Sequence, residues 1–428
     1  MSGVVQAPTT RERPPYVQHD TCRFCQGKRL ATILDFGVVP LAGAFLKEEQ
    51  IPEEQRYPLQ VCFCHDCTLV QVVNAIAADV LFSNYFYFSS AIQTLVQHFE
   101  QFAQELVERF LKPGMLAMEI GCNDGVFLKP LSVRGIRCLG VDPATNVVHS
   151  IRSADFSVLN DFFGERVAAT LRDQHGQADA ILSSYSFAHI DDMQDVMRGV
   201  KVLLKPEGVF VFEVFYLPIL LEELQYDMIY HEHFSYYSLI VLERFFARFD
   251  MEVFDVKTIP GVRAGTMRFY VRTIGQRKEP VSSGVQALRE RERALGLDQF
   301  ETYATFAQRV HRSRTELLEL LEQLKRQGKR IIGYGASGRA TTIMNFCGID
   351  VRFLDYVVDD APAKQGFYTP GTHLLIKPWA ATDTPPRPDY ALAFAWSFID
   401  EVIRRRADYI QQGGKFIVPL PRVRMVPE

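Results

Sequence analysis

The sequence predicts an α/β protein in which two doubly wound, Rossmann-like units follow an N-terminal metal-binding module. Five of the eight cysteines lie in the first 85 residues, which sets that part of the chain apart. Residues 88–250 alternate amphipathic helices with short apolar strands, and the alternation returns after a charged helical stretch at about 281–328. Strands separated by helices are typical of a parallel sheet covered by helices on both faces.

Length and composition limit the classes of function. A chain of 428 residues exceeds one hydrophobic core, so we expect three domains, at residues 1–87, 88–250 and 251–428. The net charge of -4 provides no broad basic field, so nucleic acid is not an expected partner. No apolar run approaches the roughly 18 residues of a membrane span, and no apolar signal segment opens the chain. We therefore expect a cytoplasmic protein without a membrane partner.

Two CxxC pairs in the N-terminal part predict a metal site. Each pair aims two sulfurs at one point, and two pairs complete a tetrahedral site for zinc. The expected ligands are Cys22, Cys25, Cys64 and Cys67. Because four protein ligands leave no open position, this zinc would be structural rather than catalytic. Cys62 is a spare thiol and His65 an alternative ligand, and two unrelated pairs of buried thiols are the second interpretation.

A Gly-rich turn of the form E-x-G-x-x-x-G follows the predicted strand MLAMEI and precedes a helix. Gly121 and Gly125 allow the backbone to approach a ligand closely, and Glu119 ends the strand. Asp142 ends the next strand about 20 residues further on, where an acid suits a pair of ribose hydroxyls. A dinucleotide fingerprint would read G-x-G-x-x-G, so the single wide turn favours S-adenosylmethionine over NAD. The other expected cofactor contacts are Asn123, Asp161, Phe162 and Ser184.

Residues 226–237 form the densest polar and aromatic stretch of the chain. They contain two of the ten histidines, one glutamate and four tyrosines. They follow a predicted strand, GVFVFEVF, at the sheet edge where α/β proteins bind ligands. Histidine titrates near neutrality, so the stretch favours acid–base chemistry. The alternatives are a second metal site, although His-Glu-His lacks the HExxH spacing, and a buried core histidine with satisfied hydrogen bonds.

Together these features resemble the three-domain sugar C-methyltransferases that act on nucleotide-linked keto sugars. The resemblance spans nearly the whole chain. Besides the cysteine module and residues 226–237, it is carried by Y-x-Y-x-S-S at residues 85–90, GYGASGRATTIMNFCGI and VVDDAPAKQGFYTPGTH. It implies that a base removes a proton beside a ketone and that the resulting enolate attacks the sulfonium methyl. The acceptor would be a 4-keto sugar linked to a nucleotide such as dTDP or GDP.

The resemblance also implies the residues that carry this chemistry. Tyr230 would be the base, with Glu232 and His233 in the same proton network. The other residues expected near the reacting centre are His189, Tyr85 and Tyr87. The second Gly-rich turn would cradle a diphosphate, because glycine amides and a helix N-terminus favour an anion; the alternative is a turn that only stabilises the fold. The expected substrate contacts are Arg268, Gly335, Ser337, Arg339, Lys364 and Tyr368.

Three positions depart from the family pattern, which often has asparagine at Ser184 or Tyr185, lysine near Arg339 and asparagine at Ser397. These departures leave the sugar and the nucleotide open. Three other functions also stay open. They are methylation of oxygen or nitrogen on another small molecule, a non-catalytic scaffold with this fold, and a nicotinamide oxidoreductase based on the second turn.

Overall fold

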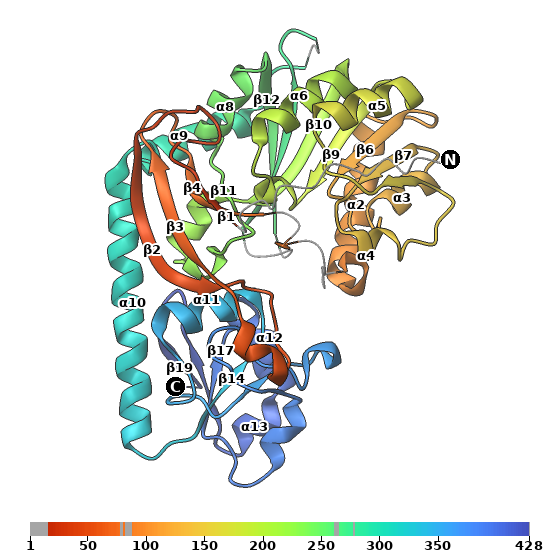
Figure 1. Ribbon diagram of the computed structural model, residues 1–428. Coiled ribbons are helices and arrows are strands. Elements are labelled where there is room, and N and C mark those ends of the chain that lie inside the picture. Colours follow the sequence, from red (N-terminus) through yellow and green to blue (C-terminus); the bar gives the residue numbers. More distant parts are fainter. Residues whose placement is uncertain (1–15, 78–79, 82–87, 261–264, 277–278, 428) are drawn as a thin grey trace, which may run out of the picture.

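The computed structural model describes residues 16–77, 80–81, 88–260, 265–276 and 279–427. Figure 1 shows two lobes that are joined along one side by a long two-stranded ribbon and by a long helix, α10. Tyr85 and Tyr87 lie outside the described residues. No helix within the described ranges is long and apolar enough to span a membrane.

The N-terminal module is an antiparallel sheet with the strand order β11-β4-β3-β2. Three of these strands are local: β2 (Leu30–Pro40), β3 (Arg56–Cys64) and β4 (Val70–Val72). The fourth, β11 (Ser235–Tyr236), comes from the histidine-rich segment far along the chain. A short ladder pairs β1 (Tyr16–Gln18) with β5 (Asn74–Ile76), and η1 is Glu48–Glu53.

The upper lobe contains a seven-stranded sheet with the order β12-β13-β10-β9-β6-β7-β8. Its strands are β6 (Leu116–Ile120), β7 (Arg137–Val141), β8 (Ser157–Leu159), β9 (Ala178–Ser184), β10 (Leu204–Phe215), β12 (Met251–Ile259) and β13 (Thr266–Thr273). Strands β6 to β10 are parallel, whereas β12 and β13 are antiparallel. The domain boundary expected at residue 250 therefore falls inside this sheet, which continues to Thr273.

Helices cover this sheet and place loops at the carboxyl ends of its strands. They are η2 (Ser89–Ala91), α2 (Gln93–Arg109), α3 (Leu128–Val133), α4 (Thr145–Val148), α5 (Glu165–His175), η3 (Phe187–His189), α6 (Met193–Leu203), α7 (Leu217–Glu222), η4 (Tyr226–Met228) and α8 (Leu239–Ala247). The central strands β6, β9 and β10 are buried over most of their length, which explains their nearly continuous apolar sequences. This architecture confirms the predicted doubly wound domain.

The lower lobe is a second, six-stranded sheet with the order β16-β15-β14-β17-β18-β19. Its strands are β14 (Ile331–Tyr334), β15 (Val357–Val358), β16 (Ile376–Lys377), β17 (Tyr390–Ala393), β18 (Lys415–Val418) and β19 (Arg424–Val426). Its helices are α11 (Gly338–Cys347), η5 (Pro362–Lys364), η6 (Trp379–Asp383), η7 (Trp396–Phe398), α12 (Ile399–Arg405) and α13 (Ala407–Gln411). Only β19 runs antiparallel, so the second Rossmann-like unit is confirmed.

Helices α9 (Ser283–Ala294) and α10 (Phe300–Arg326) connect the two lobes. The buried apolar residues of α10 recur at helical spacing and form one stripe: Tyr303, Phe306, Val310, Leu317, Leu321 and Leu324. This stripe packs into a core shared by the N-terminal ribbon, the segment around η4 and the lower sheet. The hydrophobic stripe of α10 therefore fixes the lobes against each other.

Candidate active site and structural metal site

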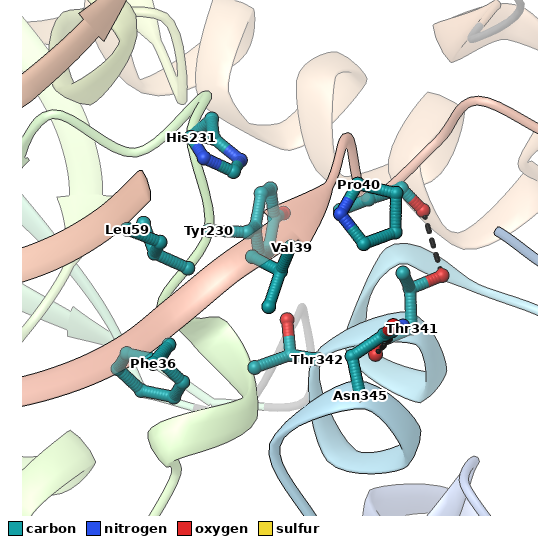
Figure 2. Close-up of a pocket in the computed structure, with 10 residues that line it drawn as sticks. Phe36, Val39, Pro40, Leu59, Tyr230, His231, Thr341, Thr342 and Asn345 are labelled. Atoms are coloured by element: carbon teal, nitrogen blue, oxygen red, sulfur yellow. Dashed lines mark hydrogen bonds between the residues drawn. The ribbon is translucent and has the colours of Figure 1, made fainter. Parts of the chain in front are cut away.

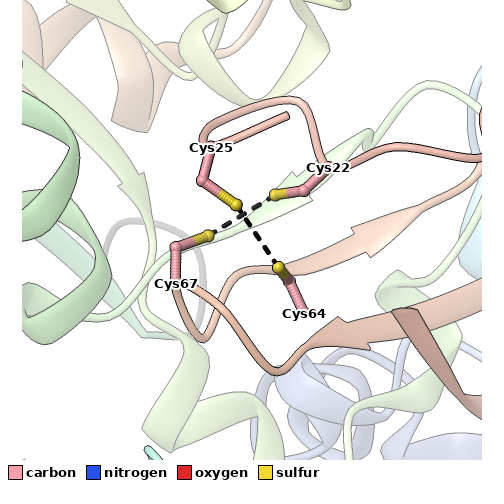
Figure 3. Close-up of side chains that lie close together, drawn as sticks. All are labelled: Cys22, Cys25, Cys64 and Cys67. Atoms are coloured by element: carbon pink, nitrogen blue, oxygen red, sulfur yellow. Dashed lines mark hydrogen bonds between the residues drawn. The ribbon is translucent and has the colours of Figure 1, made fainter. Parts of the chain in front are cut away.

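Four cysteine thiols gather at one point of the N-terminal module (Figure 3). The sulfur atoms of Cys22, Cys25, Cys64 and Cys67 all lie within 4.8 Å of one another. The shortest separations are 3.4 Å, between Cys22 and Cys67, and 3.5 Å, between Cys25 and Cys64. A tetrahedral zinc with bonds of about 2.3 Å sets its sulfurs roughly 3.8 Å apart, so the four thiols fit this ion. Contacts among the thiols lower the pKa of Cys22 and raise the pKa of Cys67, so these four groups share their protons as one cluster.

The other two candidate ligands of the N-terminal module point elsewhere. The sulfur of Cys62 lies 3.7 Å from the hydroxyl of Thr32, and burial raises the pKa of this thiol. The ring of His65 packs against Phe63 and Phe300. Neither side chain belongs to the four-sulfur cluster.

The E-x-G-x-x-x-G turn lies at the carboxyl end of β6 and requires glycine at both positions. Gly121 has a φ of 70° and Gly125 a φ of 77°, in the left-handed region. A Cβ on Gly121 would lie 2.4 Å from the Cβ of Ser186, and one on Gly125 would lie 2.4 Å from the ring of Phe156. Asn123, between them, also has a positive φ, of 50°. Glycine is therefore required at both positions by the backbone conformation and by the close packing of Ser186 and Phe156.

Asp142 is fixed next to this turn by two backbone amides. Its Oδ2 accepts a hydrogen bond of 2.8 Å from the amide of Asn123, and its Oδ1 accepts one of 2.9 Å from Ala144. These bonds hold the carboxylate at the end of β7 while leaving lone pairs available. The arrangement suits recognition of ribose hydroxyls, as the sequence predicts.

Asp161 and Phe162 follow β8, on the far side of β7. Asp161 pairs with Arg166 at 2.6 Å and also accepts a bond from the amide of Phe162. The side chain of Phe162 is 52% exposed, which is unusual for a large apolar ring. An exposed ring at the carboxyl edge of the sheet is available for stacking on an adenine.

Three buried polar atoms near the turn have no hydrogen-bond partner in the described part of the chain. They are Oε2 of Glu119, Oδ1 of Asp124 and Oγ of Ser184. Burial, followed by the charges of Asp142, Asp124 and Glu213, raises the pKa of Glu119 well above its usual value. Buried polar groups are normally satisfied, so the unpartnered oxygens of this acid-rich site fit a positively charged ligand. The ammonium and sulfonium groups of S-adenosylmethionine have the charge that these residues fit.

Two backbone amides at the start of the described range 88–260 bind the side chains of this turn. The amide of Ser89 donates to the Oδ1 of Asn123 at 2.9 Å, and the amide of Ser90 donates to Asp124 at 3.1 Å. The backbone after the two tyrosines is therefore anchored on the cofactor turn.

His233 lies within a cluster of rings that belong to expected site residues. Its ring lies 4.0 Å from that of Tyr230 and 5.0 Å from that of His189, measured between ring centroids. Its Nδ1 lies 2.7 Å from the carbonyl oxygen of Met228, and since a carbonyl only accepts, Nδ1 carries the proton. Burial lowers the pKa of His233 to about 3 and that of His189 to about 4. Both rings are therefore neutral near pH 7, and Nε2 of His233 bears a lone pair.

Glu232 belongs to the histidine-rich segment and faces a loop of the N-terminal module. Burial raises the pKa of its carboxyl group to about 7. A Cβ on Gly43 would lie 3.9 Å from its Oε1, so the loop after β2 approaches the carboxylate closely. Glu232 can therefore exchange a proton in the physiological range.

All three domains hold the histidine-rich segment. On the N-terminal side, β11 pairs with β4. On the methyltransferase side, the amide of Phe234 donates to the carbonyl of Ala188 at 2.9 Å. Figure 2 shows the third contact, where Tyr230 and His231 line a small cavity with residues of β2, β3 and α11. His231 donates from Nε2 to the carbonyl oxygen of Pro58 at 3.2 Å and therefore helps to join the module to the site.

The second Gly-rich turn precedes α11 in the lower lobe. Gly335 has a φ of 93°, and a Cβ there would lie 3.3 Å from that of Ala395. Ser337 caps α11, because its Oγ accepts a 3.2 Å bond from the amide of Ala340. Beyond the turn, a Cβ on Gly338 would lie 3.3 Å from the Cβ of Ala42. The turn thus faces the same N-terminal loop that approaches Glu232.

Two of the remaining expected substrate residues already have protein partners. Lys364 donates from Nζ to the carbonyl of Ala336 at 2.7 Å and lies 3.3 Å from Asp359. Asp359 in turn accepts a 2.8 Å bond from the amide of Ala336. Tyr368 exchanges two backbone hydrogen bonds with Leu46. Lys364 therefore borders the turn and stabilises its local structure, whereas Tyr368 pairs with the N-terminal module.

Arg268 does not lie with the other expected substrate residues. It is 2% exposed in β13, and its guanidinium pairs with Glu213 at 2.7 Å and with Glu105 at 2.9 Å. Glu213 also bonds Nε2 of His98 at 2.8 Å. This buried network joins α2 to the methyltransferase sheet. Arg268 therefore stabilises the fold of this domain.

Asp227 is a site residue that the sequence analysis missed. It is fully buried in η4, and its Oδ2 accepts bonds of 2.8 Å from Nε of Arg339 and from Nε1 of Trp396. The available signal was a single acid within an otherwise aromatic and apolar run, YDMIY. Such an acid requires a cation, because an unpaired buried carboxylate is costly.

Comparison with known proteins covers the same three parts of the chain. Residues 22–82 match a family model described as "Putative zinc binding domain", and residues 95–256 match one described as "Methyltransferase domain". Residues 261–421 match "C-methyltransferase C-terminal domain". The chain is 34% identical over 410 residues to the C-methyltransferase NovU of Streptomyces niveus, which covers 95% of this chain and 97% of that protein.

Other similarities are confined to part of the chain. A ubiquinone biosynthesis O-methyltransferase of Azorhizobium caulinodans is 30% identical over 118 residues, or 27% of this chain and 46% of that protein. Among solved structures, the glycopeptide N-methyltransferase MtfA complexed with S-adenosyl-L-methionine aligns at 15% identity with a TM-score of 0.32. That alignment covers 41% of this chain and 87% of MtfA.

The doubly wound domain, its E-x-G-x-x-x-G turn and the methyltransferase match define an S-adenosylmethionine-dependent methyltransferase. The similarity to NovU extends over nearly the full length of both proteins and includes the C-terminal domain. The chain belongs to this family of C-methyltransferases.

Proposed function

We propose that this enzyme methylates a carbon beside the ketone of a nucleotide-linked 4-keto sugar, such as a dTDP- or GDP-sugar. One observation carries the proposal. A single segment, residues 226–237, contacts the methyltransferase domain through Ala188 and the C-terminal Gly-rich turn through Arg339. A proton acceptor on that segment lies between a site for the methyl donor and a site for an anionic acceptor.

Each of the three parts of the chain would have its own role in the reaction. The N-terminal module, expected at residues 1–87, holds the histidine-rich segment and contains a structural zinc. The middle domain binds the donor, and the C-terminal domain binds the nucleotide of the acceptor. All described cysteines are free, which agrees with the reducing cytoplasm as the compartment in which four thiolates stay available for zinc.

The proton is removed within the Tyr230–His233 cluster. Tyr230 is our assignment for the base. Its phenol proton would pass to the lone pair on Nε2 of the neighbouring neutral His233, and the resulting phenolate would accept the proton from the carbon beside the ketone. The C–H bond breaks, its electron pair forms the enolate, and the enolate carbon attacks the methyl group. S-adenosylmethionine supplies a methyl group on a sulfonium that leaves as a neutral thioether. The protein therefore contributes alignment, exclusion of water and a proton acceptor.

The C-terminal turn would hold the diphosphate of the acceptor. Backbone amides at the N-terminus of α11 and the guanidinium of Arg339 provide the positive end of this site. Nη2 of Arg339 is buried without a partner within the described ranges, so one donor remains available for a phosphate oxygen. Gly335 shapes the turn through its backbone conformation, and the hydroxyl of Ser337 caps α11.

Binding measurements test the two halves of this proposal separately. Calorimetry with S-adenosylmethionine should show one donor site per chain, and calorimetry with dTDP and GDP should show binding of at least one nucleotide. Binding of the donor without either nucleotide would restrict the proposal to a methyltransferase with another acceptor. Failure to bind the donor at millimolar concentration would contradict it altogether.

A further inference from the structure

The ion pair between Asp227 and Arg339 joins the histidine-rich segment to the C-terminal domain across 112 residues of sequence. Asp227 has no exposed surface, and its Oδ2 accepts both the Nε–H of Arg339 and the indole N–H of Trp396, each at 2.8 Å. The two donors come from different elements, α11 and η7. One carboxylate oxygen of Asp227 thus binds the histidine-rich segment to both α11 and η7.

Arg339 is held in a fixed orientation by further contacts. Its Nη1 donates to the hydroxyl of Ser397 at 3.2 Å, and its guanidinium carbon lies 4.8 Å from the ring centroid of Trp396. Its Nη2 and the Oδ1 of Asp227 are both buried and have no partner among the residues the structure describes. The pair is therefore only partly satisfied, although buried ion pairs need their remaining donors and acceptors filled.

The ion pair between Asp227 and Arg339 lies close to the proposed base, Tyr230. Asp227 precedes Tyr230 by three residues, and the hydroxyl of Thr342 in α11 donates to the carbonyl of Ile229 at 3.3 Å. This half of the segment is attached to α11, whereas the half after His233 is attached to the N-terminal sheet. The position of α11 consequently sets the position of Tyr230.

We propose that Asp227 is a positioning residue, which through Arg339 and Trp396 aligns Tyr230 and His233 with an acceptor bound at the C-terminal turn. The inference rests on the proposed function, because it requires the acceptor's anionic group to bind Nη2 of Arg339. That group and Asp227 then share one guanidinium. Binding of the acceptor at Arg339 therefore affects the position of the segment that removes the acceptor's proton.

The charge of Arg339 supplies an independent reason for the carboxylate. Burial is the main cause of the low pKa of His233, and the charge of Arg339 lowers it further. Asp227 offsets the charge of Arg339 beside this ring. A neutral residue at position 227 leaves that charge uncompensated before the acceptor binds, so both the orientation and the electrostatics of the proton acceptor change.

Tryptophan fluorescence can report on the link directly. The chain has two tryptophans, and the other, Trp379, packs against Tyr334 and Tyr409 in the lower lobe. In a Trp379→Phe background, emission comes from Trp396 alone, whose N–H bonds Asp227. Titration with dTDP or GDP should shift this emission, and titration with S-adenosylmethionine should not.

The decisive variant is Asp227→Asn, measured in the same background. It should still bind the nucleotide and should bind S-adenosylmethionine with unchanged affinity, but its Trp396 emission should no longer respond. With a nucleotide-linked keto sugar that the wild type methylates, kcat should fall by about 100-fold, with a much smaller change in KM. A purely structural residue would lower Tm and donor affinity together instead of lowering kcat alone.

Arg339→Lys provides a second test if Asp227→Asn does not fold. Lysine keeps the charge but loses the planar contacts to Ser397 and Trp396, so kcat should fall by about tenfold at unchanged donor affinity. Wild-type kcat in either folded variant would overturn the positioning role while leaving the acceptor class intact. Absence of dTDP and GDP binding by the wild type would instead contradict the proposed acceptor, and the positioning role with it.

Discussion

The ring of Tyr230 lies against that of His233, with centroids 4.0 Å apart and planes tilted by 36°. Because the Nδ1 proton of His233 is directed to the carbonyl of Met228, the lone pair on Nε2 is available on the other side of the ring. A phenol and a neutral imidazole thus share one confined space. This pairing is the physical basis for proton removal in the proposed reaction.

Replacing Tyr230 with phenylalanine should abolish turnover and leave the donor site intact. The substitution keeps the ring contact with His233 and removes only the hydroxyl, so we expect kcat to fall by at least ~100-fold. The affinity for S-adenosylmethionine, measured by calorimetry, should not change. Tyr303→Phe, which removes a buried hydroxyl bonded to the carbonyl of Leu297, is the matched control and should stay active. Full activity of Tyr230→Phe would remove Tyr230 as the base.

Glu232 should give the pH profile of turnover an ascending limb. Because burial raises its pKa to about 7, the carboxylate that can accept a proton forms only as the pH rises through about 7. We expect kcat to rise over this range, and Glu232→Gln should flatten the limb. A limb that persists in Glu232→Gln would assign the titration to another group.

Deprotonation of Glu232 should lower the stability of the folded protein, whereas it should raise kcat. Its folded-state pKa lies above the ordinary value of 4.5, so folding binds a proton between about pH 4.5 and 7. The contribution of Glu232 to the free energy of unfolding should therefore decrease as the pH rises through that window. His189 and His233, whose pKa values are lowered, act with the opposite sign. The difference between wild type and Glu232→Gln in denaturant unfolding isolates the glutamate.

The cysteine cluster should bind one zinc per chain, and loss of this zinc should also disturb the active site. Cys64→Ser removes a ligand and should lower both zinc content and Tm. The pair of Cys62 and Cys64 offers a close control, because Cys62 lies two residues away outside the cluster. Cys62→Ser should retain zinc, as measured by elemental analysis. The ring of Phe24, between two of the ligands, stacks 6.0 Å from that of Tyr237, so metal loss should also loosen the histidine-rich segment.

Glu119→Gln should weaken binding of the methyl donor. Glu119 offers a buried, unpartnered oxygen beside the cofactor turn, and a positively charged ligand would restore its charged form. A hydrogen bond to a charged group contributes about 1.5–3 kcal/mol, so we expect a loss in affinity of roughly 10- to 100-fold. Glu207→Gln, at the opposite, amino-terminal part of β10, should bind the donor as the wild type does. Equal affinities in the two variants would exclude Glu119 from the donor site.

Arg268→Ala should destabilise the protein rather than change its acceptor. Removing the arginine leaves Glu213 buried beside His98 without its strongest partner. Breaking a buried ion pair typically costs about 3–5 kcal/mol, which chemical denaturation can measure. A fully stable Arg268→Ala protein with weakened nucleotide binding would instead restore the substrate role expected from the sequence.

Contiguous motifs were the part of this protein that the sequence could reveal. The CxxC pairs and the E-x-G-x-x-x-G turn each place their groups within a few residues, so local geometry alone brings them together. The two sheets were predictable for the same reason, since each strand and helix has its own apolar pattern. The boundary at residue 250 was not, because β12 and β13 join the sheet by antiparallel pairing that periodicity does not encode.

Contacts between distant segments lay beyond sequence reasoning. The sequence shows Arg268 only as a cation in an apolar strand, and its partner Glu213 lies 55 residues away on the neighbouring strand. Similarly, nothing local indicates that β11 completes the N-terminal sheet or that Asp227 bonds Arg339. Such pairs depend on tertiary packing, and they determine how the histidine-rich segment is held.

The most direct test of the central claim is the connectivity of the transferred methyl group. The enzyme would be incubated with S-adenosylmethionine labelled with ¹³C in its methyl group and with dTDP- and GDP-linked 4-keto sugars, and the products examined by NMR. We predict a methyl carbon coupled directly to the sugar carbon beside the ketone, formed by the wild type and not by Tyr230→Phe. A methyl resonance bonded to oxygen, or no labelled product from any nucleotide-linked keto sugar, would contradict the account.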